Sequence, residues 1–282
     1  AIVRAGGTPI FVDVRPQDLT IDPVATQKLI DENALDALMP VDEFGYPSDV
    51  VSLRRQSPYL PVIEDAACAF GTRSTPAIGA NSDAWCYSLH PRKVLTAGEG
   101  GLICTNDEKL AGKLRLARNH GIEPSGEGID CVVAGTNGRM TEIQAVLALD
   151  QLKTLPSRLI RRQEIADKYL HELQGASLRL PVVPENCQLN WQTFLIRFPS
   201  QESRNIAMSE LRRKGISSTV AAQCIPAMKG YRGGKSLSHV AHAYPNAWDA
   251  WTTGLGIPLH EHMSDDDVNR VVSALLALEV AK

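Results

Sequence analysis

Four features of the sequence between residues 61 and 105 have the side chains and spacing to act on one ligand. The carboxylate of Asp65 follows one short apolar run, and the amine of Lys93 follows the next one along the chain. Ser88 stands five residues before Lys93, and the glycine-rich segment 97–101 comes just after it. Taken singly, such an aspartate caps a turn and such a lysine is solvated at the surface. Taken together they indicate a shared site.

An amine and a carboxylate on one ligand are what pyridoxal phosphate requires. The lysine amine forms a Schiff base with the aldehyde, and the carboxylate keeps the pyridine nitrogen protonated. Once released by an incoming amine, the same lysine can carry a proton as general base and acid. A serine hydroxyl can hold the phosphate, and glycines allow the backbone close to the cofactor. We therefore expect Lys93 and Asp65 to be catalytic and Ser88 to bind the cofactor.

These side chains need a scaffold that brings strand ends together. The first half of the chain alternates apolar runs with amphipathic stretches, which predicts strands at 10–14, 37–41, 62–64, 84–89 and 101–105 and helices at 23–32, 48–56 and 107–119. This alternation is typical of an α/β domain with a mostly parallel central sheet flanked by helices. Polar residues beyond the carboxyl ends of such strands converge on a ligand crevice.

The second half has a different pattern. Thr141 and Gln144 form a capping-box sequence that predicts a helix, Pro156 is expected to end it, and a second helix is expected over 157–173. Further on we expect a strand at 191–198, a helix at 208–214 and a final helix capped by Ser264. We therefore divide the chain into a large cofactor-binding domain, 1–155, and a linking helix with a smaller α+β domain, 156–282.

Composition excludes several classes of protein. The 282 residues are 44% hydrophobic and 22% charged, as in ordinary globular proteins. The 29 Lys and Arg against 32 Asp and Glu give a charge of −3, which does not favour nucleic-acid binding. The sequence contains no membrane-spanning apolar run and no signal-peptide pattern. The six cysteines form no C-x-x-C pair, which favours reduced thiols in a cytoplasmic protein over a metal site.

Three segments carry a family resemblance. They read IEDAACAFG, CYSLHPRKVLTAGEGGLICTND and GTNGRMTEIQAVLALDQL, and they resemble the DegT/StrS-type sugar aminotransferases. The opening AGGTPIFVDVRPQDLTIDP and the closing GIPLHEHMSDDDVNRVVSAL are similar to that family too, so the resemblance covers essentially the whole chain. It implies a fold-type I enzyme that uses pyridoxal phosphate.

The resemblance implies a role for each matching residue. Lys93 would form the Schiff base, Asp65 would pair with the pyridine nitrogen, and Ser88 would hold the phosphate. Cys68 falls where many members have a Gln near the ring hydroxyl. Asn137 matches an Asn that in relatives reaches the phosphate of the neighbouring subunit. This last match predicts a homodimer with shared active sites.

The chain also departs from the family pattern. Members normally have a further N-terminal segment, about a quarter of the full length, with a helix start that binds the phosphate and a residue that stacks on the ring. These 282 residues lack it, so we expect a fragment of a longer protein. PVDEFG, at 40–45, stands where relatives often have His or Ser after Val, which leaves the substrate open. His90 either borders the site or steers the turn into Lys93, and Glu99 is expected to be a buried carboxylate.

The resulting functional hypothesis is transfer of an amino group from Glu or Gln to a keto sugar, with a nucleotide-linked sugar favoured. Some relatives replace the lysine with His and become dehydratases, and Lys93 therefore favours transamination. Two alternatives stay open. The ketone can be a cyclitol or another non-sugar compound, or the chain can be an inactive family member that serves as a binding or regulatory protein.

Overall fold

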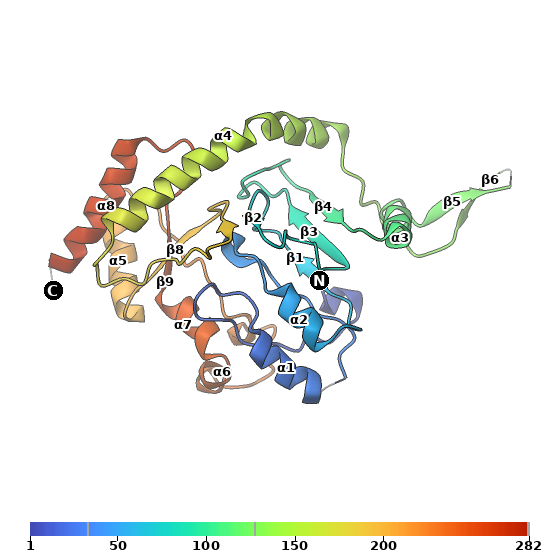
Figure 1. Cartoon of the computed structure of the whole chain (residues 1–282), viewed down its shortest axis with the longest axis horizontal. Helices are drawn as coiled ribbons and strands as arrows, with labels where there is room; N and C mark the ends of the chain where they lie inside the picture. The colour runs from blue at the N-terminus through green and yellow to red at the C-terminus, as the bar shows by residue number, and fades with distance from the viewer. Residues whose placement is uncertain (33, 127, 281–282) are drawn as a thin grey trace.

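A computed structural model describes residues 1–32, 34–126 and 128–280 of the chain. Figure 1 shows one long helix, α4 (Glu142–Glu172), crossing the top of the molecule. The small central sheet lies below one part of this helix, and the C-terminal helices lie below the other. Helix α4 therefore joins the two parts of the chain that the sequence distinguishes.

The central sheet contains β1 (Ile63–Asp65), β3 (Ala84–Ser88) and β4 (Gly101–Cys104), in the order β1-β3-β4. Strands β1 and β3 are parallel, and β3 and β4 are antiparallel. These three strands confirm three of the predicted ones. The predicted strand at 37–41 is present only as two parallel bridges beside β1, Leu38 to Val62 and Val41 to Asp65.

The strand predicted at 10–14 is wrong. Only Val14 makes a bridge, to Ile21. The carboxylate of Asp13 accepts hydrogen bonds from the backbone N–H groups of Asn246 and Ala247. This segment is therefore tied to the start of helix α7 (Pro245–Thr253) and not to a sheet.

The predicted helices of the first half are confirmed as α1 (Pro23–Glu32), α2 (Val50–Gln56) and α3 (Glu108–Arg118). An aspartate side chain caps the N-terminus of α2 and of α3: Asp49 accepts from the Ser52 N–H, and Asp107 accepts from Lys109 and Leu110. Helix α2 is held against the sheet by a small core of Leu38, Val50, Leu53 and Val62.

The helix break predicted at Pro156 is wrong, because α4 runs through it without interruption. The proline ring lacks an N–H, and such a residue inside a helix costs about 3 kcal/mol. The buried residues Ala148 and Leu155 lie before it, and Ile165 and Tyr169 lie after it. Packing on both sides therefore outweighs the local preference for a break. The division of the chain at residue 155 stays a prediction.

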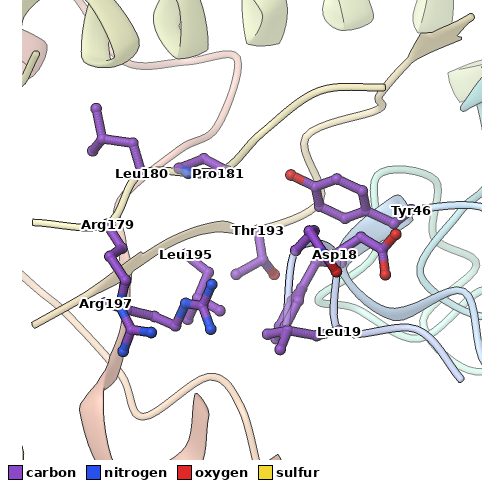
Figure 2. Close-up of a pocket in the computed structure, with 11 residues that line it drawn as sticks. Asp18, Leu19, Tyr46, Arg179, Leu180, Pro181, Thr193, Leu195 and Arg197 are labelled. Atoms are coloured by element: carbon purple, nitrogen blue, oxygen red, sulfur yellow. The ribbon is translucent and has the colours of Figure 1, made fainter. Parts of the chain in front are cut away.

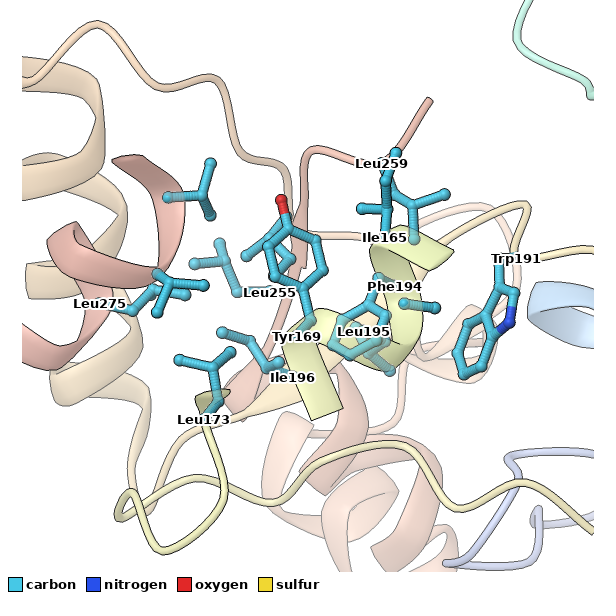
Figure 3. Packing of buried hydrophobic residues seen from close by; sticks show 14 of the residues in the cluster. Ile165, Tyr169, Leu173, Trp191, Phe194, Leu195, Ile196, Leu255, Leu259 and Leu275 are labelled. Atoms are coloured by element: carbon cyan, nitrogen blue, oxygen red, sulfur yellow. The ribbon is translucent and has the colours of Figure 1, made fainter. Parts of the chain in front are cut away.

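The main core lies in the C-terminal part (Figure 3). Strand β8 (Phe194–Arg197) pairs antiparallel with β9 (Gly254–Ile257), and the pair packs with α4, α5 (Gln201–Arg213) and α8 (Asp265–Val280). Phe194, Ile196 and Leu255 are fully buried there. The predicted cap of the last helix is confirmed, since the Ser264 hydroxyl accepts from the Asp267 N–H at 3.1 Å.

The other elements are short. They are the 3₁₀ turns η1 (Val3–Ala5), η2 (Glu43–Gly45) and η3 (Ile225–Ala227), the strands β2 (Arg73–Ser74), β5 (Ile122–Ser125), β6 (Gly128–Cys131) and β7 (Cys187–Gln188), and helix α6 (Leu237–Ala243). Strands β5 and β6 form a hairpin that projects beyond α3 (Figure 1). Within the described part of the chain, no helix has the length and apolar character needed to cross a membrane.

Candidate active site

The backbone of Asp65 is held on both sides at the carboxyl end of β1. Its N–H donates to the Pro40 carbonyl at 2.8 Å, and its carbonyl accepts from the Asp42 N–H at 2.9 Å. On the other side it is the register partner of Cys86 in β3. Its side chain accepts from the Ala67 N–H at 3.1 Å. The half-buried carboxylate is thus fixed at the edge of the sheet where ligands of α/β proteins bind.

Lys93 lies in the loop that follows β3. Its N–H donates to the His90 carbonyl at 2.9 Å, and the His90 Nδ1 accepts from the Arg92 N–H at 3.1 Å. These bonds support the interpretation that His90 steers the turn into Lys93. The amine of Lys93 then reaches across to Cys68, with Nζ 3.0 Å from Sγ. Lys93, predicted from its place after a strand, and Cys68, implied by the family resemblance, are therefore in direct contact.

Glu43, in turn η2, is a residue of the candidate site that the sequence analysis did not name, although it had linked the surrounding segment 40–45 to the substrate. Burial raises the pKa of its carboxyl group, while the charge of Lys93 lowers this pKa and the charge of Asp65 raises it. Glu43 therefore lies among the same groups. The position of Glu43 in the sequence could have indicated this role. It follows the extended segment 37–41, and the end of that segment lies beside the end of β1.

Asp42, directly before Glu43, is fully buried. Its Oδ1 accepts from the Ser48 N–H at 2.8 Å, and its Oδ2 has no hydrogen-bond partner among the described residues. Burial, reinforced by the nearby charge of Glu64, raises the pKa of Asp42 to about 8. Burial therefore favours the protonated form of Asp42 more than in an exposed aspartate, and its Oδ1 bond anchors the turn.

The remaining predicted residues lie in two places. Ser88 ends β3, half-buried, and its hydroxyl accepts from the His90 N–H at 3.2 Å. It therefore belongs to the strand that leads into the Lys93 loop. Asn137 is exposed and pairs through its backbone with Asn119, at the end of α3. The expectation for Glu99 is wrong: its side chain is 75% exposed, because the glycine turn around it faces outward.

A pocket lies beside the same turn η2, and its lining includes neither Asp65 nor Lys93 (Figure 2). Tyr46 lines it together with Arg179 and Arg197. The Tyr46 hydroxyl is buried without a hydrogen-bond partner among the described residues, and burial raises its pKa. Phe44 also lines this pocket, whereas its neighbour Glu43 is close to Lys93. The turn therefore separates the pocket from the lysine site.

Over residues 1–276 the chain matches the DegT/DnrJ/EryC1/StrS aminotransferase family. It belongs to that family. SpsC of Bacillus subtilis, a spore coat polysaccharide biosynthesis protein, is 31% identical over 97% of this chain and 74% of its own length. The resemblance stated from the motifs is thereby confirmed, and the chain is an aminotransferase.

Solved structures of family members have the same fold. The PLP form of Spr1654 from Streptococcus pneumoniae, a putative sugar aminotransferase, is 25% identical with a TM-score of 0.90, over 99% of this chain and 77% of that one. DesV of S. venezuelae is 30% identical with a TM-score of 0.87, over 99% and 74%. The predicted fold-type I architecture is confirmed.

The position of Glu43 in this aminotransferase leads to a test on Cys68. Burial raises the pKa of the Cys68 thiol, the charge of Glu43 raises it further, and the Lys93 amine lowers it. Glu43→Gln is therefore expected to lower the pH at which Cys68 becomes reactive. Alkylation with iodoacetamide across a pH series, followed by peptide mass spectrometry, measures this midpoint. The exposed Cys131 is the internal reference, and an unchanged or higher midpoint for Cys68 contradicts the placement of Glu43.

Proposed function

We propose that this aminotransferase moves an amino group from Glu or Gln to a nucleotide-linked keto sugar, using pyridoxal phosphate. The observation that carries the proposal is the contact of the Lys93 amine with Cys68, at 3.0 Å, beside the carboxylates of Asp65 and Glu43. The family and the sugar aminotransferases among its solved structures support a sugar substrate. The PLP form of Spr1654 supports the cofactor.

The donor set of the site fits pyridoxal phosphate. In our proposal Lys93 holds its aldehyde end, Asp65 its ring nitrogen, Cys68 its ring hydroxyl and Ser88 its phosphate, while Asn137 reaches the phosphate in a partner subunit. An amine, a fixed carboxylate and a hydroxyl on one sheet edge are the groups that such a ligand needs. When bound, the cofactor supplies an aldehyde for amines and a ring that stabilises negative charge on the substrate carbon.

The protein's own groups would then hold and move protons. Lys93 Nζ sits on a loop fixed by the His90 contacts, so its amine can take a proton from the substrate carbon and return it. Cys68 stays a neutral thiol at neutral pH, because burial and the charge of Glu43 raise its pKa. Asp65 contributes a fixed negative charge from a rigid strand end.

Assays with a panel of ketones test the proposal. Nucleotide-linked keto sugars, free keto sugars and cyclitol ketones are each offered with Glu or Gln, and the amine product is measured by mass spectrometry. We expect amination of a nucleotide-linked keto sugar, with the parallel-line kinetics of a two-step exchange. Amination of cyclitols alone would support the non-sugar alternative. Failure to take up pyridoxal phosphate would support the inactive binding protein.

We also propose that the protein works as a homodimer. Large apolar side chains are exposed on the first half of α4 and on the β5–β6 hairpin, among them Ile143 at 76%, Val146 and Ile129. Exposed apolar groups gathered in this way are typical of interaction surfaces.

If the protein is a dimer, light scattering is expected to give a mass of about twice that of one chain. Val146→Glu is expected to reduce the measured mass to that of a single chain, because a charge buried in an apolar interface is costly. Val24→Glu, at a still more exposed position on α1, is the matched control and is expected to leave the mass unchanged. A wild-type protein with the mass of a single chain would contradict the proposal.

A further inference from the structure

Lys93 is held by a side chain from a distant part of the sequence. Gln192 accepts from the Val94 N–H at 3.1 Å through Oε1 and donates to the Arg92 carbonyl at 2.6 Å through Nε2. One amide group therefore bonds to the backbone on both sides of Lys93. With both bonds made, the peptide groups flanking the lysine are fixed in direction, and so is the start of its side chain.

Asn190, two residues earlier, holds the loop of Cys68 in the same way. Its Nδ2 donates to the Cys68 carbonyl at 2.8 Å and to the Phe70 carbonyl at 3.0 Å. Its Oδ1 accepts from the backbone N–H of Gln192 at 2.9 Å, which links the Asn190 side chain to the residue that holds Lys93. The two loops whose side chains meet at the Nζ–Sγ contact are thus both bonded to residues 190–192.

The same segment also reaches turn η2. The Asn190 N–H donates to Thr72 Oγ1 at 3.1 Å, and Thr72 Oγ1 donates to the Gly45 carbonyl at 2.9 Å. A Cβ on Gly45 would lie 2.3 Å from Asn190 Oδ1, so the close packing requires glycine there. Residues 190–192 therefore contact the three segments that carry Lys93, Cys68 and Glu43.

The segment is itself anchored in the C-terminal core. Trp191 is 1% exposed and has a φ of 50°, a strained value for a residue with a large side chain. Its Nε1 donates to Gln163 Oε1 at 2.9 Å, and its carbonyl accepts from the Arg162 guanidinium at 2.9 Å. Such strain persists only where the surroundings hold it, and it gathers at functional sites.

We propose that Asn190, Trp191 and Gln192 form a positioning clamp that sets the Lys93–Cys68 contact from the C-terminal core. The clamp residues act through the backbone of the two loops, with Gln192 as the positioning residue for Lys93. The inference rests on the proposed function of Lys93 as the cofactor-binding amine. The placement of that amine, and hence its reaction with an aldehyde, depends on the two bonds made by Gln192.

The chain offers a matched control on the same loop. Gln151 of α4 accepts from the Thr96 N–H at 3.2 Å and donates to the Thr96 carbonyl at 2.7 Å. Gln192→Met and Gln151→Met each remove two bonds to the loop and keep a side chain of similar length. Only the Gln192 bonds flank Lys93. If Gln192 only stabilises the loop, the two substitutions should change the reaction of Lys93 with pyridoxal phosphate to a similar degree. If Gln192 positions Lys93, only Gln192→Met should slow that reaction.

The test labels Lys93 with pyridoxal phosphate and borohydride at a series of pH values and measures the modified peptide by mass spectrometry. Alkylation of Cys68 is measured on the protein without added pyridoxal phosphate. For Gln192→Met we expect labelling of Lys93 at least about 10-fold slower, since small misplacements of a reacting group cost that much or more. We also expect slower alkylation of Cys68 at a given pH, because the displaced Lys93 amine no longer lowers the pKa of the thiol. For Gln151→Met we expect both rates to be within about twofold of the wild type. Equal effects of the two changes, or none, would overturn the clamp.

A second variant covers the case in which Gln192→Met does not fold. Gln192→Glu keeps an oxygen for the Val94 N–H, replaces the donor to the Arg92 carbonyl with a second oxygen and adds a negative charge. We expect its labelling rate to be below that of the wild type, and a wild-type rate would overturn the role of the Arg92 bond. If Lys93 is not labelled in the wild-type protein, the proposed function is contradicted. The clamp is then tested by the rate of Cys68 alkylation alone.

Discussion

Lys93→Ala is expected to reduce amino transfer by at least about 10³-fold, because the change removes both the amine that holds the cofactor and the group that moves the proton. Trapping of pyridoxal phosphate by borohydride at position 93 is expected to disappear as well. The measurement combines steady-state assay of amine product with mass spectrometry of the trapped peptide.

The same variant has a readout that is independent of the cofactor. The Lys93 amine donates to the Cys68 thiol and lowers its pKa. Without the amine, the pKa of Cys68 is expected to rise, and the thiol is expected to be alkylated more slowly at a given pH. Lys109→Ala, on the exposed surface of α3, is the control and is expected to behave as wild type. A Lys93→Ala protein with near-normal activity would refute the assignment of this lysine.

Asp65→Asn is expected to lower the rate of amino transfer by about 10²- to 10³-fold, the usual cost of removing one preorganised electrostatic contact. The amide keeps the size of the side chain and an oxygen that can accept the Ala67 N–H, which the carboxylate accepts at 3.1 Å. Only the charge beside the proposed ring nitrogen is lost. Lys93 is expected to remain trappable by pyridoxal phosphate and borohydride, which separates loss of rate from loss of binding.

A second aspartate provides the control for this change. Asp107 caps α3 by accepting from two backbone N–H groups, and asparagine caps helices about as well as aspartate. Asp107→Asn is therefore expected to leave both activity and stability unchanged. Activity of Asp65→Asn within about tenfold of the wild type would show that the carboxylate has no electrostatic role.

Much of the site was predictable from local patterns. Asp65 and Lys93 follow apolar runs, and the carboxyl ends of neighbouring strands in an α/β sheet meet at one edge. The placement of Cys68 came from the family resemblance, and its contact with Lys93 agrees with that placement. Helix starts were predicted where a side chain and the backbone it caps are adjacent in sequence, as at Thr141 and Ser264.

Other residues of the site were beyond such patterns. Glu43 comes from a segment that joins β1 through two isolated bridges and forms no continuous strand, and its turn depends on Phe44 with a φ of 58°. Gln192 lies about 100 residues from the backbone groups that it contacts. Glutamate and glutamine are common surface residues, and neither type indicates a site by itself.

Pro156 shows the same limit for a helix: its local preference predicted a break, and buried contacts on both sides of it outweighed that preference. The sequence by itself determined the family, the strand ends that carry the amine and the acid, and the helix caps, because these depend on side chains and backbone close together in the chain. Only the tertiary structure decided which distant groups surround Lys93. Those contacts form when the packing of the whole chain brings the segments together, and that packing can overcome local preferences of a few kcal/mol.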